Sequence, residues 1–221
     1  TSVPKNNTSN NEEKEVSLPT DSYVVKRLIT GMHFVDGTNI EKALYVNERT
    51  IAKDLPGDFL DNLLLKEAYR TESNFNEEVK VKDLEQARIN LFGKNYEIII
   101  PTDKEVGSCP VFKYNTEKRS YKRDNSECNI TNDISISYDV VEARIIENKS
   151  ITIYEAVAFI KDDKIYKKID GSNNVSDEVK DVTTDGFNVL DNVKKLNQYK
   201  YTFTYDKDSN NYVFNSIELV K

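Results

Sequence analysis

Two cysteines, Cys109 and Cys128, are the residues whose spacing most clearly predicts a chemical bond. The chain between them reads as two short strands, 111–114 and 120–123, around a polar turn. A hairpin of this kind brings its two ends together, so we expect a disulfide. Closing a loop of about 20 residues would stabilise the fold by roughly 3 kcal/mol and would place the protein in an oxidising compartment. Two free thiols in a cytosolic protein are the alternative.

His33 is the only histidine, and we predict no catalytic role for it. A general base needs a partner and a pocket, and the sequence identifies neither, so a surface or helix-end position is the simpler interpretation. One histidine and two cysteines leave almost no way to build a zinc site from nitrogen and sulfur ligands. The motifs GxSxG, GxGxxG, HExxH and the phosphate-binding GxxxxGK do not occur. We therefore predict no catalytic residue, no metal and no cofactor.

The segment 206–210, Asp-Lys-Asp-Ser-Asn, has the alternating oxygen ligands that begin a calcium-binding loop. The rest of that motif is missing, because Asn211 stands where the loop needs glycine and Ile217 where it needs glutamate. The expected flanks are also strands rather than helices. A hairpin turn rich in Asp and Asn is the better interpretation.

A row of aromatic side chains on the last predicted hairpin is the one candidate ligand surface. Exposed tyrosine and phenylalanine faces could hold a sugar ring or a partner protein. The same row would form the side of a sheet that packs on helices, which is the interpretation we favour. The row comprises Tyr199, Tyr201, Phe203 and Tyr205, with Tyr212 and Phe214 on the same face across the turn.

Composition excludes some functions. The chain has 31 basic and 38 acidic residues, a net charge of −7 and no long block of one sign, so nucleic-acid binding is not expected. The abundance of acids makes any particular carboxylate pair for glycoside hydrolysis uninformative. No run of about 18 apolar residues is present, so no segment of this sequence is expected to span a bilayer.

Residues 1–20 differ from the rest of the chain. They are dominated by Asn, Ser, Thr, Glu and Lys and cannot bury enough surface to offset the entropy of ordering. We predict a disordered polar leader or linker over 1–20 and a single domain over 21–221. Because the chain begins with Thr1 rather than Met, we expect a signal peptide, a lipid anchor or a transmembrane helix to precede it.

Helical periodicity comes first in the domain and strand periodicity second. Apolar positions repeat at helical spacing in 22–34, 59–70 and 82–94, with Gly31 and Gly93 as candidate helix ends. The period becomes two from Tyr96 onward, and strand 151–160 is apolar on both faces, so we expect it to be central. Segments 34–55 and 171–198 stay undecided. The predicted strands are 96–100, 111–114, 120–123, 134–146, 151–160, 164–169, 199–205 and 212–220.

This element order predicts an α+β fold, with about three N-terminal helices packed on one C-terminal antiparallel sheet of roughly five to seven strands. Helices wrapped by a curved antiparallel sheet resemble cystatin-like or NTF2-like domains, over residues 22–221 and in element order alone. The resemblance has no specific motif and implies no function.

The composition, rich in Asn, Lys, Ile and Tyr, suggests a low-GC bacterium. Taken together, these features predict an extracytoplasmic binding or structural module without catalytic activity, secreted from the bacterium or anchored to its surface. Its partner would be a protein or carbohydrate at the cell surface, and it would meet the membrane only through an anchor before Thr1. Two other classes stay open. One is a hydrolase that uses acidic residues, and the other is a sensor domain with an apolar ligand cavity between helices and sheet.

Overall fold

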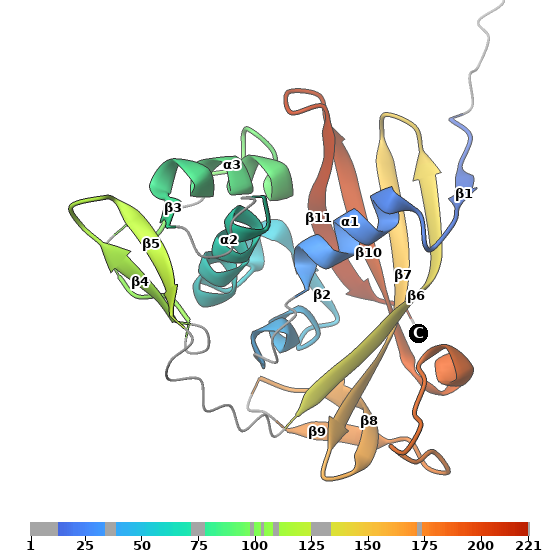
Figure 1. Cartoon of the computed structure of the whole chain (residues 1–221). Coiled ribbons are helices and arrows are strands. Elements are labelled where there is room, and N and C mark those ends of the chain that lie inside the picture. Colours follow the sequence, from blue (N-terminus) through green and yellow to red (C-terminus); the bar gives the residue numbers. More distant parts are fainter. Residues whose placement is uncertain are drawn as a thin grey trace, which may run out of the picture.

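The computed structural model describes residues 13–33, 39–71, 78–97, 100–102, 104–107, 111–124, 134–171 and 174–220. The mixed α+β class is as predicted, with more residues in strands than in helices. The prediction of one sheet is wrong, because the described strands form an antiparallel sheet of 8 strands and a separate sheet of 3. Helices α2 and α3 lie between the two sheets, and α1 crosses one face of the larger sheet (Figure 1).

The larger sheet contains the predicted hairpins β6–β7, β7–β8 and β10–β11, to which β1, β2 and β9 add strands that the pattern does not predict. Its main path runs β1-β6-β7-β10-β11-β2, while β8 pairs with the far end of β7 and then with β9. The strands are β1 (Val16–Leu18), β2 (Arg49–Ile51), β6 (Ser135–Ile146), β7 (Ser150–Lys161), β8 (Lys164–Ile169), β9 (Val175–Glu178), β10 (Asn197–Asp206) and β11 (Asn211–Leu219).

Strand β7 is central, as its composition predicts. In its first half buried and partly exposed residues alternate, whereas residues 155–159 are all buried. Ile153 and Val157 face the main core under the helices, and Ala156 and Ala158 face a second core on the opposite side of the sheet. The 3-10 helix η3 (Leu190–Lys195) and the residues around it, including Val189 and Leu196, cover that opposite side.

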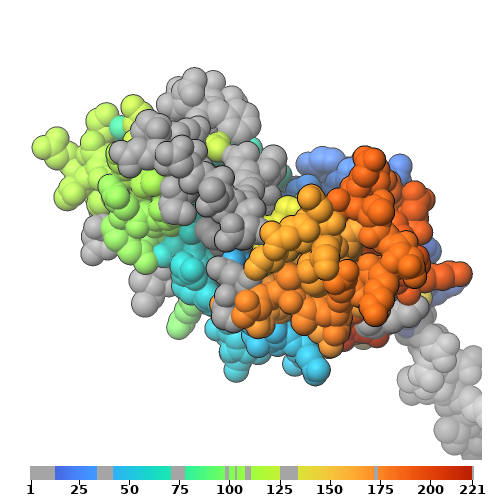
Figure 2. Space-filling model, turned by 90° about the horizontal axis from the view of Figure 1, so that it is seen from below, coloured from blue at the N-terminus to red at the C-terminus, as the bar shows by residue number. Residues whose placement is uncertain are grey.

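The smaller sheet contains β3 (Val79–Lys80), β4 (Val111–Asn115) and β5 (Ser120–Asp124) in the order β3-β5-β4. The hairpin β4–β5 therefore forms where it is predicted, but it joins a two-residue strand beside α3 instead of the larger sheet. Hairpin formation depends on local turn chemistry, whereas the choice of sheet depends on long-range contacts. Viewed from below, this hairpin lies at one end of the molecule, and the β8–β9 region faces the viewer (Figure 2).

The described residues form the α-helices α1 (Tyr23–Met32), α2 (Gly57–Thr71) and α3 (Val81–Phe92). Each buries the apolar face that its spacing predicts: Val25 and Leu28 in α1, Leu63 in α2, and Leu84 and Ala87 in α3 are at most 7% exposed. Within the described residues, no helix combines the length and apolarity needed to cross a membrane.

The two glycines proposed as helix ends behave differently. Gly93 is the C-cap of α3 with a φ of 90°, as predicted, and its N–H donates to the carbonyl of Ile89. Gly31 is not a terminator, because α1 continues to Met32 and has His33 as its C-cap. Lys66 from α2 replaces a glycine cap there by donating its ammonium hydrogens to the carbonyls of Thr30 and Gly31 at 2.7 and 3.0 Å.

Several local predictions need correction. Tyr96, Glu97 and Ile100 are not in a strand, and residues 98–99 lie outside the described residues. Val16–Leu18, within the predicted leader, forms β1 at the edge of the sheet, while residues 1–12 lie outside the description. The undecided segment 34–55 contains η1 (Asn39–Leu44), β2 and η2 (Ala52–Asp54), and the undecided segment 171–198 contains β9 and η3.

Candidate functional site

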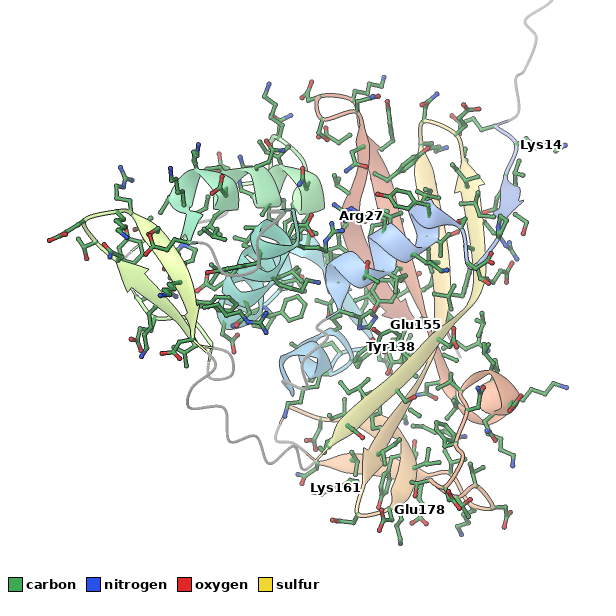
Figure 3. All side chains as sticks on the ribbon, in the orientation of Figure 1. Lys14, Arg27, Tyr138, Glu155, Lys161 and Glu178 are labelled. Carbon is green, nitrogen blue, oxygen red and sulfur yellow. The ribbon has the colours of Figure 1, made fainter. Side chains whose placement is uncertain are left out.

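The most polar place in the main core is a group of five residues that we call the His33 cluster: His33, Tyr45, Tyr138, Glu155 and Tyr201. Each comes from a different part of the chain. His33 ends α1, Tyr45 follows η1, and the other three lie on the neighbouring strands β6, β7 and β10. Tyr138 and Glu155 lie close together near the end of α1 (Figure 3).

Hydrogen bonds connect the polar atoms of the cluster. His33 Nε2 lies 2.7 Å from Glu155 Oε1, and the Tyr45 hydroxyl donates to Glu155 Oε2 at 3.0 Å. The hydroxyl oxygens of Tyr45 and Tyr201 are 3.2 Å apart. Because the Tyr45 hydrogen is directed to Glu155, the Tyr201 hydroxyl is the donor in this contact. Both oxygens of the carboxylate therefore take part in a hydrogen bond.

Four of the five residues are almost completely removed from solvent, whereas Tyr138 is partly buried. Glu155 and Tyr201 are 0% exposed, His33 2% and Tyr45 3%. The imidazole stacks on the ring of Tyr138, with centroids 3.7 Å apart and an angle of 9° between the planes. Burial raises the pKa of the neighbouring Tyr199 to about 12, and the charge of Glu155 adds to this rise. The geometry is that of a buried polar network that fixes the end of α1 on the sheet.

The expectation for His33 is correct in one respect and wrong in another. It is a helix-end residue, but it is not at the surface, and Glu155 supplies the partner that the sequence does not identify. Glu155 does carry one signal in the sequence. It occupies a core-facing position of β7 in register with Ile153 and Val157, where a charged residue requires a buried partner.

A second buried carboxylate, Glu67 of α2, lies between two arginines. Glu67 Oε1 accepts hydrogen bonds of 2.8 Å from both Arg27 of α1 and Arg70 of α2, and Arg70 Nε donates to Oε2 at 3.0 Å. Arg27 points from α1 toward α2 (Figure 3). The Glu67 side chain is 0% exposed, so the two ion pairs that share it join α1 to α2 inside the protein.

Segment 206–210, which begins like a calcium-binding loop, forms the β10–β11 turn, and the interpretation as a hairpin turn is confirmed. Asp206 Oδ2 accepts hydrogen bonds from the backbone N–H groups of Lys94 and Ser209, each at 3.2 Å, and from the Ser209 hydroxyl at 2.6 Å. Asp208 accepts one from the Asn95 amide. These contacts join the turn to the end of α3. No group of three or more His, Cys, Asp or Glu side chains among the described residues is arranged to hold a metal ion.

The aromatic row is mainly part of the core. Tyr199, Tyr201, Phe203 and Phe214 are at most 3% exposed, and Phe203 and Phe214 are cross-strand partners. The far pair, Tyr205 and Tyr212, is only partly buried. The core interpretation is therefore confirmed for four of the six residues, which leaves no continuous aromatic surface for a ligand.

The predicted disulfide cannot be assigned, because Cys109 and Cys128 both lie outside the described residues. The hairpin between them is described, and its last register pair is Val111 with Asp124. Comparison with known proteins adds no assignment: no family model, no curated protein and no solved structure matches the chain.

Proposed function

We propose that the chain is a non-catalytic binding or structural module that a bacterium carries outside its cytoplasm, secreted or attached to its surface. The observation that carries this proposal is the antiparallel pairing of β4 with β5, because it constrains the two chain ends that lead to the cysteines. The proposal includes an unidentified protein or carbohydrate partner at the cell surface. Description of the fold as cystatin-like or NTF2-like remains part of the proposal and rests on element order alone.

The register of the hairpin supports a disulfide between Cys109 and Cys128. Val111 lies opposite Asp124, so the chain enters and leaves the hairpin at neighbouring points. Cys109 is two residues before Val111, and Cys128 is four residues after Asp124. A disulfide needs Cα atoms within about 7 Å, and connections this short allow the two cysteines to reach each other. A stable disulfide, in turn, favours an extracytoplasmic protein.

The state of the buried polar groups supports a non-catalytic role over a hydrolase. A carboxylate-dependent hydrolase needs acids that face a substrate. The two carboxylates with no exposed surface, Glu67 and Glu155, are instead held by internal partners. Acids such as Glu78, Asp177 and Asp206 accept hydrogen bonds from Ser120, Lys168 and Ser209 respectively, which lower their pKa values. The lowered pKa values keep Glu78, Asp177 and Asp206 ionised, whereas a general acid requires a raised pKa.

Intact mass measurement tests the compartment. Cells that produce the full protein are treated with an alkylating reagent before lysis, and the protein is weighed with and without prior reduction. We expect no alkylated thiol without reduction and two after reduction. The variant Cys109→Ser is the control, because it leaves Cys128 unpaired and should gain one alkyl group without reduction. Two alkylated thiols in the non-reduced natural protein would contradict the proposal.

Surface exposure is tested separately on intact cells with an amine-reactive reagent that does not cross membranes. The many lysines of the chain should be labelled to the same extent as those of a known surface protein, while a cytosolic protein stays unlabelled. Labelling only after lysis would rule out a surface location even if the disulfide were present.

A further inference from the structure

The end of α1 is held to the rest of the protein by two different kinds of contact. Lys66 donates its ammonium hydrogens to the carbonyls of Thr30, Gly31 and His33, where a positive charge suits the negative end of the helix dipole. The second contact is the 2.7 Å hydrogen bond between the His33 ring and Glu155 of β7. Only the second contact depends on a group that gains or loses a proton near neutral pH.

Both carboxyl oxygens of Glu155 take part in hydrogen bonds. His33 reaches one oxygen and the Tyr45 hydroxyl donates to the other, which is the pattern of a carboxylate anion with both oxygens satisfied. An anion with 0% exposure is costly unless a positive charge lies beside it. The imidazole of His33 lies 2.7 Å from the Glu155 carboxylate and can carry this positive charge.

The groups around the His33 ring agree with a charged imidazole. Glu155 of β7 faces it directly, and Tyr138 of β6 presents the face of its ring at 3.7 Å, an arrangement that attracts a cation. The ring of Tyr201 of β10 lies 6.3 Å from the imidazole between centroids, and its hydroxyl contacts that of Tyr45. Lys66 of α2 is a nearby cation that also donates to the backbone carbonyl of His33, at the negative end of α1.

We propose that His33 and Glu155 form a proton-linked latch, an imidazolium–carboxylate pair that holds the end of α1 on the sheet more firmly in mildly acidic than in mildly alkaline solution. The sign follows from proton counting. Histidine in an unfolded chain loses its proton near pH 6.5, and the folded pair keeps that proton to a higher pH. The folded state then binds more protons than the unfolded state, so stability decreases as pH rises through this window. This inference does not depend on where the protein resides in the cell.

The sole histidine permits a direct test in the unmodified protein. The chain contains one histidine, so the imidazole carbon and nitrogen resonances of the folded protein belong to His33 without further assignment. We expect these resonances to report a charged imidazole at pH 6.5 and to titrate above the unfolded value of about 6.5. A ring that is neutral at pH 6, or that titrates at or below about 6.5, would overturn the proposal.

Glu155→Gln tests whether the carboxylate is the cause. We expect the titration of His33 in this variant to move to about pH 6.5 or lower. In parallel, urea unfolding of the natural protein between about pH 6 and pH 8 should show the unfolding equilibrium constant rising with pH, by at most about tenfold per unit for one linked proton. The variant should lose this dependence, whereas the exposed-site control Glu85→Gln should retain it. Unchanged titration in Glu155→Gln would overturn the latch, and if the variant does not fold, the resonances of the natural protein decide.

Discussion

The backbone of Gly93 lies against the carboxylate of Asp206, so closely that a Cβ atom at position 93 would be 2.9 Å from Asp206 Oδ2. Gly93 ends α3 and Asp206 begins the β10–β11 turn, so this contact joins a helix to the larger sheet. The Gly93 backbone also has φ 90° and ψ 167°, a conformation that is essentially restricted to glycine. Both the space and the backbone at this position therefore require glycine.

Gly93→Ala should destabilise the protein by about 1–3 kcal/mol, because alanine is strained in this backbone conformation and its methyl group would displace Asp206. Urea unfolding followed by circular dichroism measures the change. Gly57→Ala is the matched control, since Gly57 begins α2 and has no neighbouring atom within 4 Å of the added Cβ. Equal losses in the two variants would show that the contact with Asp206 has no special role.

The stability that Asp206 contributes should be lost in acid. Hydrogen bonds from the Ser209 hydroxyl and from the backbone N–H groups of Lys94 and Ser209 lower its pKa below the ordinary value of 3.8. A lowered pKa contributes stability that is fully present above 3.8 and is lost as pH falls from there through the folded-state pKa. Asp206→Asn should therefore be less stable than the natural protein at pH 6, and the difference should shrink below pH 3.8.

Asp208→Asn is the control for this experiment, because Asp208 is in the same turn but accepts its hydrogen bond from the side chain of Asn95. Unfolding curves at several pH values distinguish the two variants. A stability difference for Asp206→Asn that stays constant down to the lowest pH would contradict the assigned role of the ionised carboxylate.

Glu67→Gln should have a large effect on stability. The change leaves Arg27 and Arg70 without the carboxylate that they share, in a place where the Glu67 side chain is 0% exposed. Removing one member of a buried ion pair costs about 3–5 kcal/mol, and we expect the lower end because both arginines keep some contact with solvent. Chemical denaturation measures the loss.

Glu85→Gln offers a closely matched comparison for Glu67→Gln. Glu85 and Arg88 of α3 form an ion pair at the same i,i+3 spacing as Glu67 and Arg70, but the Glu85 side chain is 55% exposed. An exposed pair of this kind contributes at most about 1 kcal/mol. If the two variants lost the same stability, burial of Glu67 would not be the source of its effect.

Two buried tyrosines should make the fold sensitive to alkali. Burial raises the pKa of Tyr69 and of Tyr199 to about 12, from the ordinary value of 10.0. The folded state then keeps two protons that the unfolded state releases, so stability should fall as pH rises above 10.0. Ultraviolet titration of phenolate absorbance should show two tyrosines that ionise late or only on unfolding.

The variant Tyr69→Phe separates this pH effect from a lost hydrogen bond. It removes the donor to the Tyr121 carbonyl at 2.8 Å and should cost about 0.5–1.5 kcal/mol near neutral pH. Above pH 10.0 the penalty should decrease, because the variant no longer retains that proton. A penalty that grows with pH would contradict the raised pKa.

The sequence alone determined the elements of this protein where the local pattern was strong. Each of the three α-helices has apolar residues at spacings of three and four, and the pairs β4–β5, β6–β7 and β10–β11 have alternating residues around recognisable turns. These features depend on neighbours within a few turns of helix or across one hairpin. The segments without such a pattern, 34–55 and 171–198, could not be decided, and there the chain forms short 3-10 helices and strands of three or four residues.

Tertiary structure alone decided which distant residues meet. His33 and Glu155 are separated by 122 positions, and Arg27 and Glu67 by 40, so no local period relates them. A core-facing glutamate in β7 implies a buried partner, but the partner's identity depends on where α1 crosses the sheet. The division into two sheets is decided in the same way, because the β4–β5 hairpin is equally stable locally whichever strand it joins. Local periodicity specifies helices, strands and their buried faces, whereas the packing of those faces creates the polar contacts on which the proposed latch depends.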